Sequence, residues 1–164
     1  MPKDKKKILV GIVMGSQSDW IVMKEAKKLL NDLDICSESK IISAHRTPNR
    51  ISEYAINASK KGLQIIIAGA GGAAHLPGML SSHCNLPIIG VPINSTSLNG
   101  LDSLLSIVQM PFGVPTATFA VGKAGAKNAA LFAVSILSLN DKTLSKKLAV
   151  WKKAQTQNIK LKPK

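Results

Sequence analysis

The sequence is poor in aromatic residues and in cysteine. Aromatic residues make up 4% of the 164 positions while hydrophobic residues make up 45%, so the core must be built from Ile, Leu, Val and Ala between packed layers. Only two cysteines are present, Cys36 and Cys84. Because they form no Cys-x-x-Cys pair, they indicate neither a zinc site nor a redox motif. We expect both to be reduced, structural thiols.

Long apolar runs are also missing. Gly, Pro, Ser or a charged residue interrupts every hydrophobic stretch before it reaches the roughly 20 residues that a membrane span requires. The basic start of the chain, residues 1–7, leads into a strand-like segment rather than into the apolar stretch and cleavage site of a signal peptide. These absences predict a cytoplasmic protein with no membrane partner.

Acidic residues are few, with nine Asp and Glu against 22 Lys and Arg, and the formal net charge is +13. A charge of this size can drive binding to nucleic acid. The lysines, however, cluster at residues 3–7 and 146–164, whereas the Gly-rich middle of the chain is nearly uncharged. Terminal lysines of this kind are usually solvated tails and helix faces. We therefore expect no nucleic-acid partner, and a nucleotide- or nucleic-acid-binding module stays open as an alternative.

Strand-like and helix-like segments alternate along the chain. Strand patterns occupy 8–14, 39–43, 63–68, 87–91 and 116–121. Helical patterns have apolar stripes over 22–33 and 51–58, a short helix after residue 78, and helices over 101–110, 124–139 and 141–155. This alternation predicts an α/β fold with a three-layer doubly wound parallel sheet, Rossmann-like in class, in which ligands bind beyond the carboxyl ends of the strands. We expect one catalytic domain over 1–164, with a basic extension at 1–7 and a polar tail at 156–164.

The turn after the first predicted strand has the features of a phosphate site. Gly15 allows close approach of the backbone, and Ser16 and Ser18 supply hydroxyl donors at the start of a helix. Asp19 would repel a phosphate, so its carboxylate is better suited to accepting hydrogen bonds from sugar hydroxyls. The alternative is that Ser16 or Ser18 is only an N-cap and Asp19 only a partner of the helix dipole.

The turn after the second predicted strand is the most informative segment. It runs from Ser43 to Pro48, with Thr47 expected to cap the helix that Pro48 opens. Arg46 can bind a phosphate through two parallel hydrogen bonds, and His45 can give and take protons near neutrality. A lone loop histidine is more often structural. The adjacent arginine and the position at a strand end favour a functional role here.

The Gly-rich segment 69–74 matches the loose G-x-G-x-x-A pattern of dinucleotide-binding proteins. That motif also needs an acidic residue about 20 positions later to hold a ribose, and the first acidic residue that follows is Asp102. We therefore interpret the loop as bringing backbone close to a small, flat ligand, with His75 at its rim.

Two further kinds of site are excluded by spacing. Residues 122–123 resemble the Gly-Lys of a P-loop, but alanines at 117 and 124 stand where that motif needs Gly and Ser or Thr. The three histidines, His45, His75 and His83, have neither the i, i+4 spacing nor the acidic neighbours of a metal site. We expect no metal, and we expect His83 to be structural.

Several motifs in order resemble a known family. They are residues 13–16, 18–20 and 43–48, the unbroken run 68–79, and residues 106–111 and 122–125. Over residues 8 to about 155 the chain is similar to the class I N5-carboxyaminoimidazole ribonucleotide mutases of bacterial purine biosynthesis. The resemblance implies a flavodoxin-like fold, a homo-octamer and an isomerase without metal or organic cofactor. It also implies a ribonucleotide substrate whose carbamate carboxyl moves from nitrogen to ring carbon, with CO2 as an enclosed intermediate.

The resemblance implies a role for each site residue. The phosphate would be bound by Ser16, Ser18 and Arg46, the ribose by Asp19, and the imidazole and carboxylate by Ser43, Ala44, Ala70, Gly71 and Leu76. His45 would be the acid and base. From the residues themselves, the backbone-rich loop with Gly72, which has His75 at its rim, could hold CO2 close to the ring. A carboxylase that takes free CO2 is the alternative enzyme, although the intact segment 71–77 favours the mutase.

Overall fold

The centre of the protein is a sheet whose two faces are both covered. The computed structural model describes residues 7–163, so the predicted extension at 1–7 lies outside the described residues except for Lys7. Within this range five parallel strands pair in the order β2-β1-β3-β4-β5. The strands are β1 (Val10–Met14), β2 (Ser37–Ile41), β3 (Ile65–Gly71), β4 (Ile88–Ile93) and β5 (Ala117–Thr118). This strand order is that of the flavodoxin-like fold.

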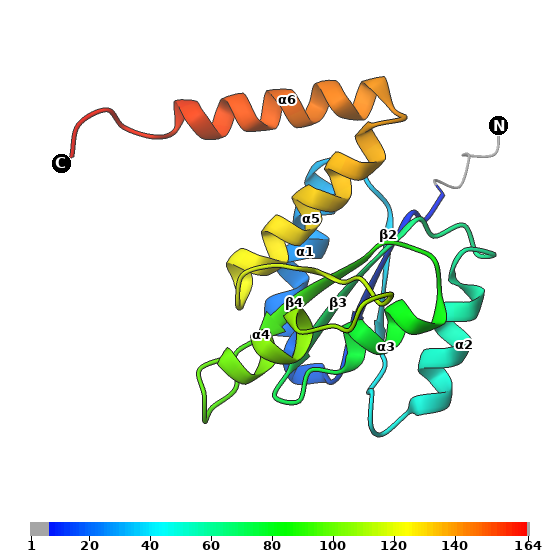
Figure 1. Cartoon of the computed structure of the whole chain (residues 1–164). Coiled ribbons are helices and arrows are strands. Elements are labelled where there is room, and N and C mark those ends of the chain that lie inside the picture. Colours follow the sequence, from blue (N-terminus) through cyan, green and yellow to red (C-terminus); the bar gives the residue numbers. More distant parts are fainter. Residues whose placement is uncertain (1–6, 164) are drawn as a thin grey trace.

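Helices cover the two faces in separate layers (Figure 1). Buried residues of α1 (Trp20–Asp32), α5 (Lys123–Ser138) and α6 (Lys142–Gln157) share one hydrophobic cluster with the sheet. Those of α2 (Pro48–Ala58), α3 (Leu76–His83) and α4 (Leu101–Val108) share the cluster on the opposite face. A 3-10 turn, Gln17–Asp19, precedes α1. The predicted three-layer doubly wound fold is confirmed.

The central strand β3 is buried on both faces, which explains why its sequence is apolar at successive positions. Ile65 and Ile67 belong to one cluster and Ile66 and Ala68 to the other, and all four are 0% exposed. A parallel strand buried on both faces needs apolar side chains at every position. Trp20 and Trp151 pack against the first cluster, as their helical positions predict.

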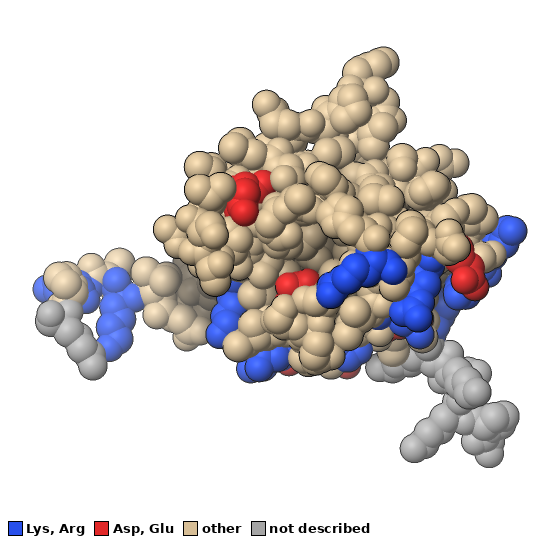
Figure 2. Space-filling model, turned by 90° about the horizontal axis from the view of Figure 1, so that it is seen from below, with Lys and Arg blue, Asp and Glu red and all other residues tan. Residues whose placement is uncertain are grey.

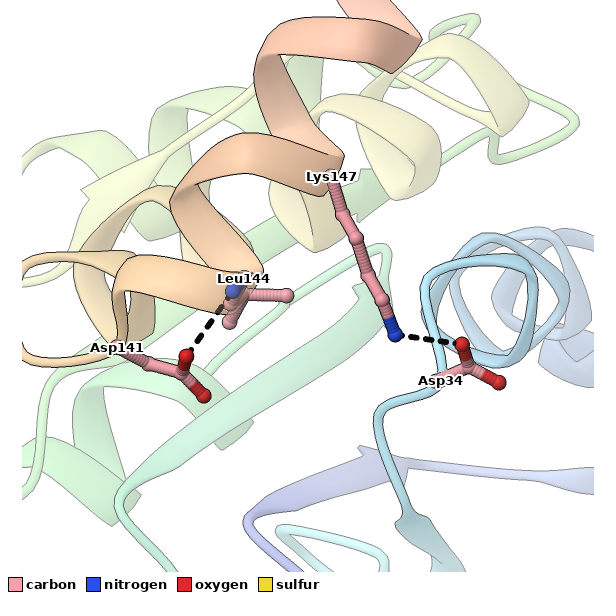
Figure 3. A network of polar contacts seen from close by, with 4 residues as sticks. All are labelled: Asp34, Asp141, Leu144 and Lys147. Carbon is pink, nitrogen blue, oxygen red and sulfur yellow. Dashed lines mark hydrogen bonds and ion pairs between the residues drawn. The ribbon is translucent and has the colours of Figure 1, made fainter.

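Helix α6 lies across the end of α5 and extends away from the sheet (Figure 1). The Asp141 carboxylate caps it by accepting hydrogen bonds from the N–H groups of Thr143 and Leu144. Lys147 Nζ lies 2.7 Å from Asp34 Oδ2, in the segment that follows α1 (Figure 3). This ion pair is half-exposed, so the buried Leu144 and Leu148 contribute more to anchoring the helix.

Several predicted boundaries are wrong. The second strand is Ser37–Ile41 rather than 39–43, because pairing with β1 sets the register Val10↔Ser37 to Met14↔Ile41. The strand expected at 116–121 shrinks to Ala117–Thr118. The Gly-rich loop is shorter than expected, since β3 stays paired with β4 as far as Gly71 and α3 begins at Leu76.

No helix in the described part of the chain has the length and apolarity of a membrane span.

Candidate functional site

A cavity of about 480 Å³ opens where the carboxyl ends of β1, β3 and β4 meet the turn after β2. The strand order reverses between β1 and β3, and open α/β sheets bind ligands at such a switch point. The lining residues come from four segments, namely Gly15, Ser16 and Asp19; residues 43–46; residues 70–73 with His75 and Leu76; and residues 93–96. Figure 2 views the molecule from this end and shows Lys and Arg side chains gathered along one half of the face.

The first turn holds a carboxylate inside the cavity. The Asp19 carboxylate accepts a hydrogen bond of 2.9 Å from the backbone N–H of Ser16, which stands at the N-cap of the 3-10 turn. The hydroxyl of Ser16 lies 2.6 Å from that of Ser18. Burial raises the pKa of Asp19, and its hydrogen bonds with Ser16 offset part of the shift. Ser16 is therefore both the N-cap of the 3-10 turn and part of the cavity wall.

The second turn is tied to the first through Arg46. Its Nε donates to the Ser43 hydroxyl at 3.1 Å and its Nη2 to the Gly15 carbonyl at 3.1 Å. A guanidinium has five N–H donors, so these two bonds leave three for a ligand. The Thr47 hydroxyl accepts from the Ser43 N–H and donates to the Ser43 carbonyl. Thr47 stands at the N-cap of α2, as predicted, but its hydroxyl makes no capping hydrogen bond because it closes the turn instead.

Two imidazoles meet at the rim of the cavity. His45 Nε2 lies 2.8 Å from His75 Nδ1, and the two rings are nearly perpendicular, with centroids 4.9 Å apart. A hydrogen bond between two imidazoles needs one protonated and one bare nitrogen. His75 directly precedes α3, so the Gly-rich loop and the second turn are joined through their histidines. His83, exposed at the end of α3, lies outside the cavity lining.

The structure brings nearly all of the predicted site residues together. Ser18 alone among them does not line the cavity, although it is in hydrogen-bond distance of Ser16, which does. Sequence reasoning missed the fourth wall, Ile93 to Thr96, which begins at the last residue of β4. A polar Asn-Ser-Thr run after an apolar strand was the available signal. Among the described residues no group of three or more His, Cys, Asp or Glu side chains is arranged to hold a metal ion.

Comparisons with known proteins point to one family. Residues 9–158 match the sequence model described as AIR carboxylase. The N5-carboxyaminoimidazole ribonucleotide mutase of Bacillus subtilis is 59% identical over 140 residues, which cover 85% of this chain and 86% of that protein. Its counterpart in Escherichia coli is 51% identical over 150 residues, covering 92% and 89%.

Solved structures agree with this similarity. The crystal structure of PurE from Treponema denticola superposes with a TM-score of 0.80 at 28% identity, covering 91% of this chain and 92% of that one. A variant of PurE2 from the same organism gives a TM-score of 0.83 at 27% identity, covering 92% of each chain.

Proposed function

The chain belongs to the AIR carboxylase family, and we propose that it acts as an N5-carboxyaminoimidazole ribonucleotide mutase in purine biosynthesis. Curated proteins of that name are 50% to 61% identical to it over most of its length. The observation that carries the proposal is the meeting of an imidazole and a guanidinium in one cavity, groups that can move a proton and bind a phosphate. There His45, hydrogen-bonded to His75, lies next to Arg46 in the same turn.

The first and second turns would hold the ribose phosphate. Arg46 offers its three remaining N–H donors, and Ser16 and Ser18 offer hydroxyls beside it. Asp19 would accept hydrogen bonds from the ribose hydroxyls, a role that needs its ionised form. Because burial makes ionisation of Asp19 less favourable, hydroxyl donors from a ribose would restore some of the solvation that the carboxylate lacks.

His45 would carry one proton out and back. When the carbamate C–N bond breaks and CO2 leaves, the departing nitrogen takes a proton from protonated His45. The ring carbon then attacks CO2, forming the new C–C bond. Neutral His45 removes the proton from that carbon and restores the aromatic ring, which yields 4-carboxy-5-aminoimidazole ribonucleotide. The histidine ends in its starting state, so no proton is consumed overall.

The contact with His75 supports a choice of the atom of His45 that would do this work. Its Nε2 is engaged by His75 Nδ1, so Nδ1 is the nitrogen left to exchange a proton with the substrate. When His45 is an imidazolium both of its nitrogens are donors, and Nε2 can then donate to a bare His75 Nδ1. We infer that His75 orients the imidazole of His45 in the proton-donating state.

The Gly-rich wall would keep CO2 beside the ring. Ala70, Gly71, Gly72 and Ala73 line the cavity with backbone and small side chains, so a flat ring and a linear molecule can lie against them. Holding CO2 there replaces a bimolecular recapture with a nearly unimolecular step. This wall is what would distinguish a mutase from a carboxylase that draws CO2 from solution.

We also propose that the enzyme works as a homo-octamer in the cytoplasm. An exposed apolar stripe supports self-association: Leu98, Leu101, Leu105 and Val108 are 49% to 56% exposed on and before α4. A groove of about 1060 Å³ adjoins it, lined mainly by apolar residues of 84–88 and 108–117. Apolar surfaces of this kind mark protein interfaces.

Light scattering on the purified protein tests the assembly. We expect the mass of eight chains, and Leu105→Asp should lower the mass because it places a charge in the stripe. Ile56→Asp is the matched control, since Ile56 is similarly exposed, at 51%, but lies on α2. A monomeric wild type would contradict the octamer.

Turnover of N5-carboxyaminoimidazole ribonucleotide tests the function itself. We expect the wild type to form the C-carboxylated product, and His45→Asn to bind the ribonucleotide while losing most turnover, because the amide keeps polarity but carries no proton. His83→Asn is the control, since it changes a histidine outside the cavity. An inactive wild type, or an active His45→Asn variant, would refute the proposal.

A further inference from the structure

A fully buried serine connects α4 to the wall of the cavity. Ser103, in the first turn of α4, is 0% exposed. Its hydroxyl donates to the Ile93 carbonyl at 2.7 Å and accepts from the Gly72 N–H at 2.9 Å. Ile93 ends β4 and Gly72 directly follows β3, and both line the cavity. One hydroxyl therefore joins two neighbouring walls of the site.

A second serine of the same helix meets the other side of the Gly72 residue. Ser106 lies one turn after Ser103; its hydroxyl donates to the Asp102 carbonyl at 2.7 Å and lies 3.4 Å from the Gly72 carbonyl. The backbone N–H and C=O of Gly72 are thus both in contact with α4. Gly72 itself has φ of +67°, a left-handed conformation that favours glycine.

The fourth wall is held from the same helical turn. The Asp102 carboxylate accepts hydrogen bonds from the Ser103 N–H at 2.9 Å and from the Ser95 hydroxyl at 2.8 Å. Ser95 lines the cavity and stands in the segment between β4 and α4. The start of α4 therefore sets the position of both the Gly-rich loop and the segment after β4.

These contacts bear on the orientation of the peptide groups in the loop. The Gly72 N–H donates to Ser103, which is outside the cavity lining. Because the peptide group is planar, the Gly71 carbonyl then points in the opposite direction. Loss of the hydroxyl would leave the Gly72 N–H and the Ile93 carbonyl without this partner, and a buried polar group without a partner is unfavourable. The loop would then shift to find other partners.

We propose that Ser103 is a positioning residue, which with Ser106 holds the Gly72 peptide so that the Gly-rich loop closes the CO2 side of the cavity. The inference rests on the proposed mutase function. Loss of this positioning would have an effect that only a reaction with a free intermediate, here CO2, can show. When the loop shifts, the C–N bond still breaks and the nitrogen is still protonated, but CO2 escapes before the ring carbon attacks it. Aminoimidazole ribonucleotide and CO2 then accumulate in place of the carboxylated product.

The test compares product formation with release of aminoimidazole ribonucleotide. For Ser103→Ala we expect kcat for product to fall by about tenfold or more. KM should change by about twofold at most, because Ser103 is outside the cavity lining. The released fraction, which is the share of consumed substrate that appears as aminoimidazole ribonucleotide, should rise. Ser103→Thr keeps a hydroxyl and should return the released fraction toward the wild-type value. Ser135→Ala is the control, since that hydroxyl donates to Leu131 within α5 and lies outside the cavity.

Thermal unfolding separates this role from a general loss of structure. A folded Ser103→Ala variant with the kcat and the released fraction of the wild type would overturn the proposal. A fall in kcat with an unchanged released fraction would overturn it as well. If Ser103→Ala does not fold, Ser106→Ala carries the test, and it should show a smaller rise of the released fraction in the same direction. A wild type that forms no product would instead refute the mutase function.

Discussion

Removing the guanidinium of Arg46 should weaken ribonucleotide binding mainly through the phosphate. Two of its N–H groups hold Ser43 and Gly15, and the others are left for the ligand. A charge-assisted hydrogen bond contributes about 1.5–3 kcal/mol. Arg46→Ala should therefore cost about 2–3 kcal/mol of binding free energy, or about 30- to 150-fold in Kd. Arg46→Lys keeps the positive charge but lacks the paired N–H donors of a guanidinium. Its Kd should therefore lie between those of the wild type and Arg46→Ala.

Calorimetric titration with a pair of ligands measures this loss. Aminoimidazole ribonucleotide and its dephosphorylated nucleoside are each titrated into the wild type and Arg46→Ala. We expect removal of the phosphate to cost the wild type far more affinity than it costs Arg46→Ala. The reason is that the variant lacks the guanidinium with which the phosphate interacts. Arg50→Ala is the control, because Arg50 is exposed on α2 and outside the cavity lining. An equal loss of affinity for both ligands would refute the assignment.

Two further predictions concern stability. Burial raises the folded-state pKa of Asp19, so its stabilising contribution is present below the unfolded pKa and is lost as pH rises through the folded value. Asp19→Asn should therefore raise the Tm at pH 7.5 while weakening ribonucleotide binding, and the Tm gain should narrow toward pH 4. A lower Tm at pH 7.5 would contradict this sign. A Cβ at Gly125 would overlap the backbone carbonyl of Ala120, so Gly125→Ala should lower the free energy of unfolding in urea by about 1–3 kcal/mol. Asn128→Ala, exposed on the same helix, should leave it nearly unchanged.

Elements with strong local signals were predictable from sequence. The Ile65–Ile67 run indicates a central strand because burial on both faces removes polar positions. Pro48 indicates the start of α2 because its missing N–H is not needed there. β2 was misplaced by two residues because Ser37 to Lys40 are polar, and their pairing with β1 rather than any apolar pattern defines the strand.

The site was predictable where it depends on chain topology and not where it depends on side-chain contacts. Strand ends of a parallel sheet meet at one edge, so the turns with Ser16 and His45 were expected to be neighbours. The bond between His45 and His75 joins residues 30 positions apart, and its geometry depends on how two turns pack. Ser103 carried no signal at all, because a serine in a helical pattern is usually exposed.

The most direct test of the account follows the origin of the transferred carboxyl. N5-carboxyaminoimidazole ribonucleotide is converted in the presence of labelled bicarbonate, and label in the product is measured against total product. We predict rapid product formation with almost no label, because CO2 stays against the Gly-rich wall between the two steps. Label entering the product as fast as product forms would show that CO2 comes from solution, and it would contradict the mutase reaction.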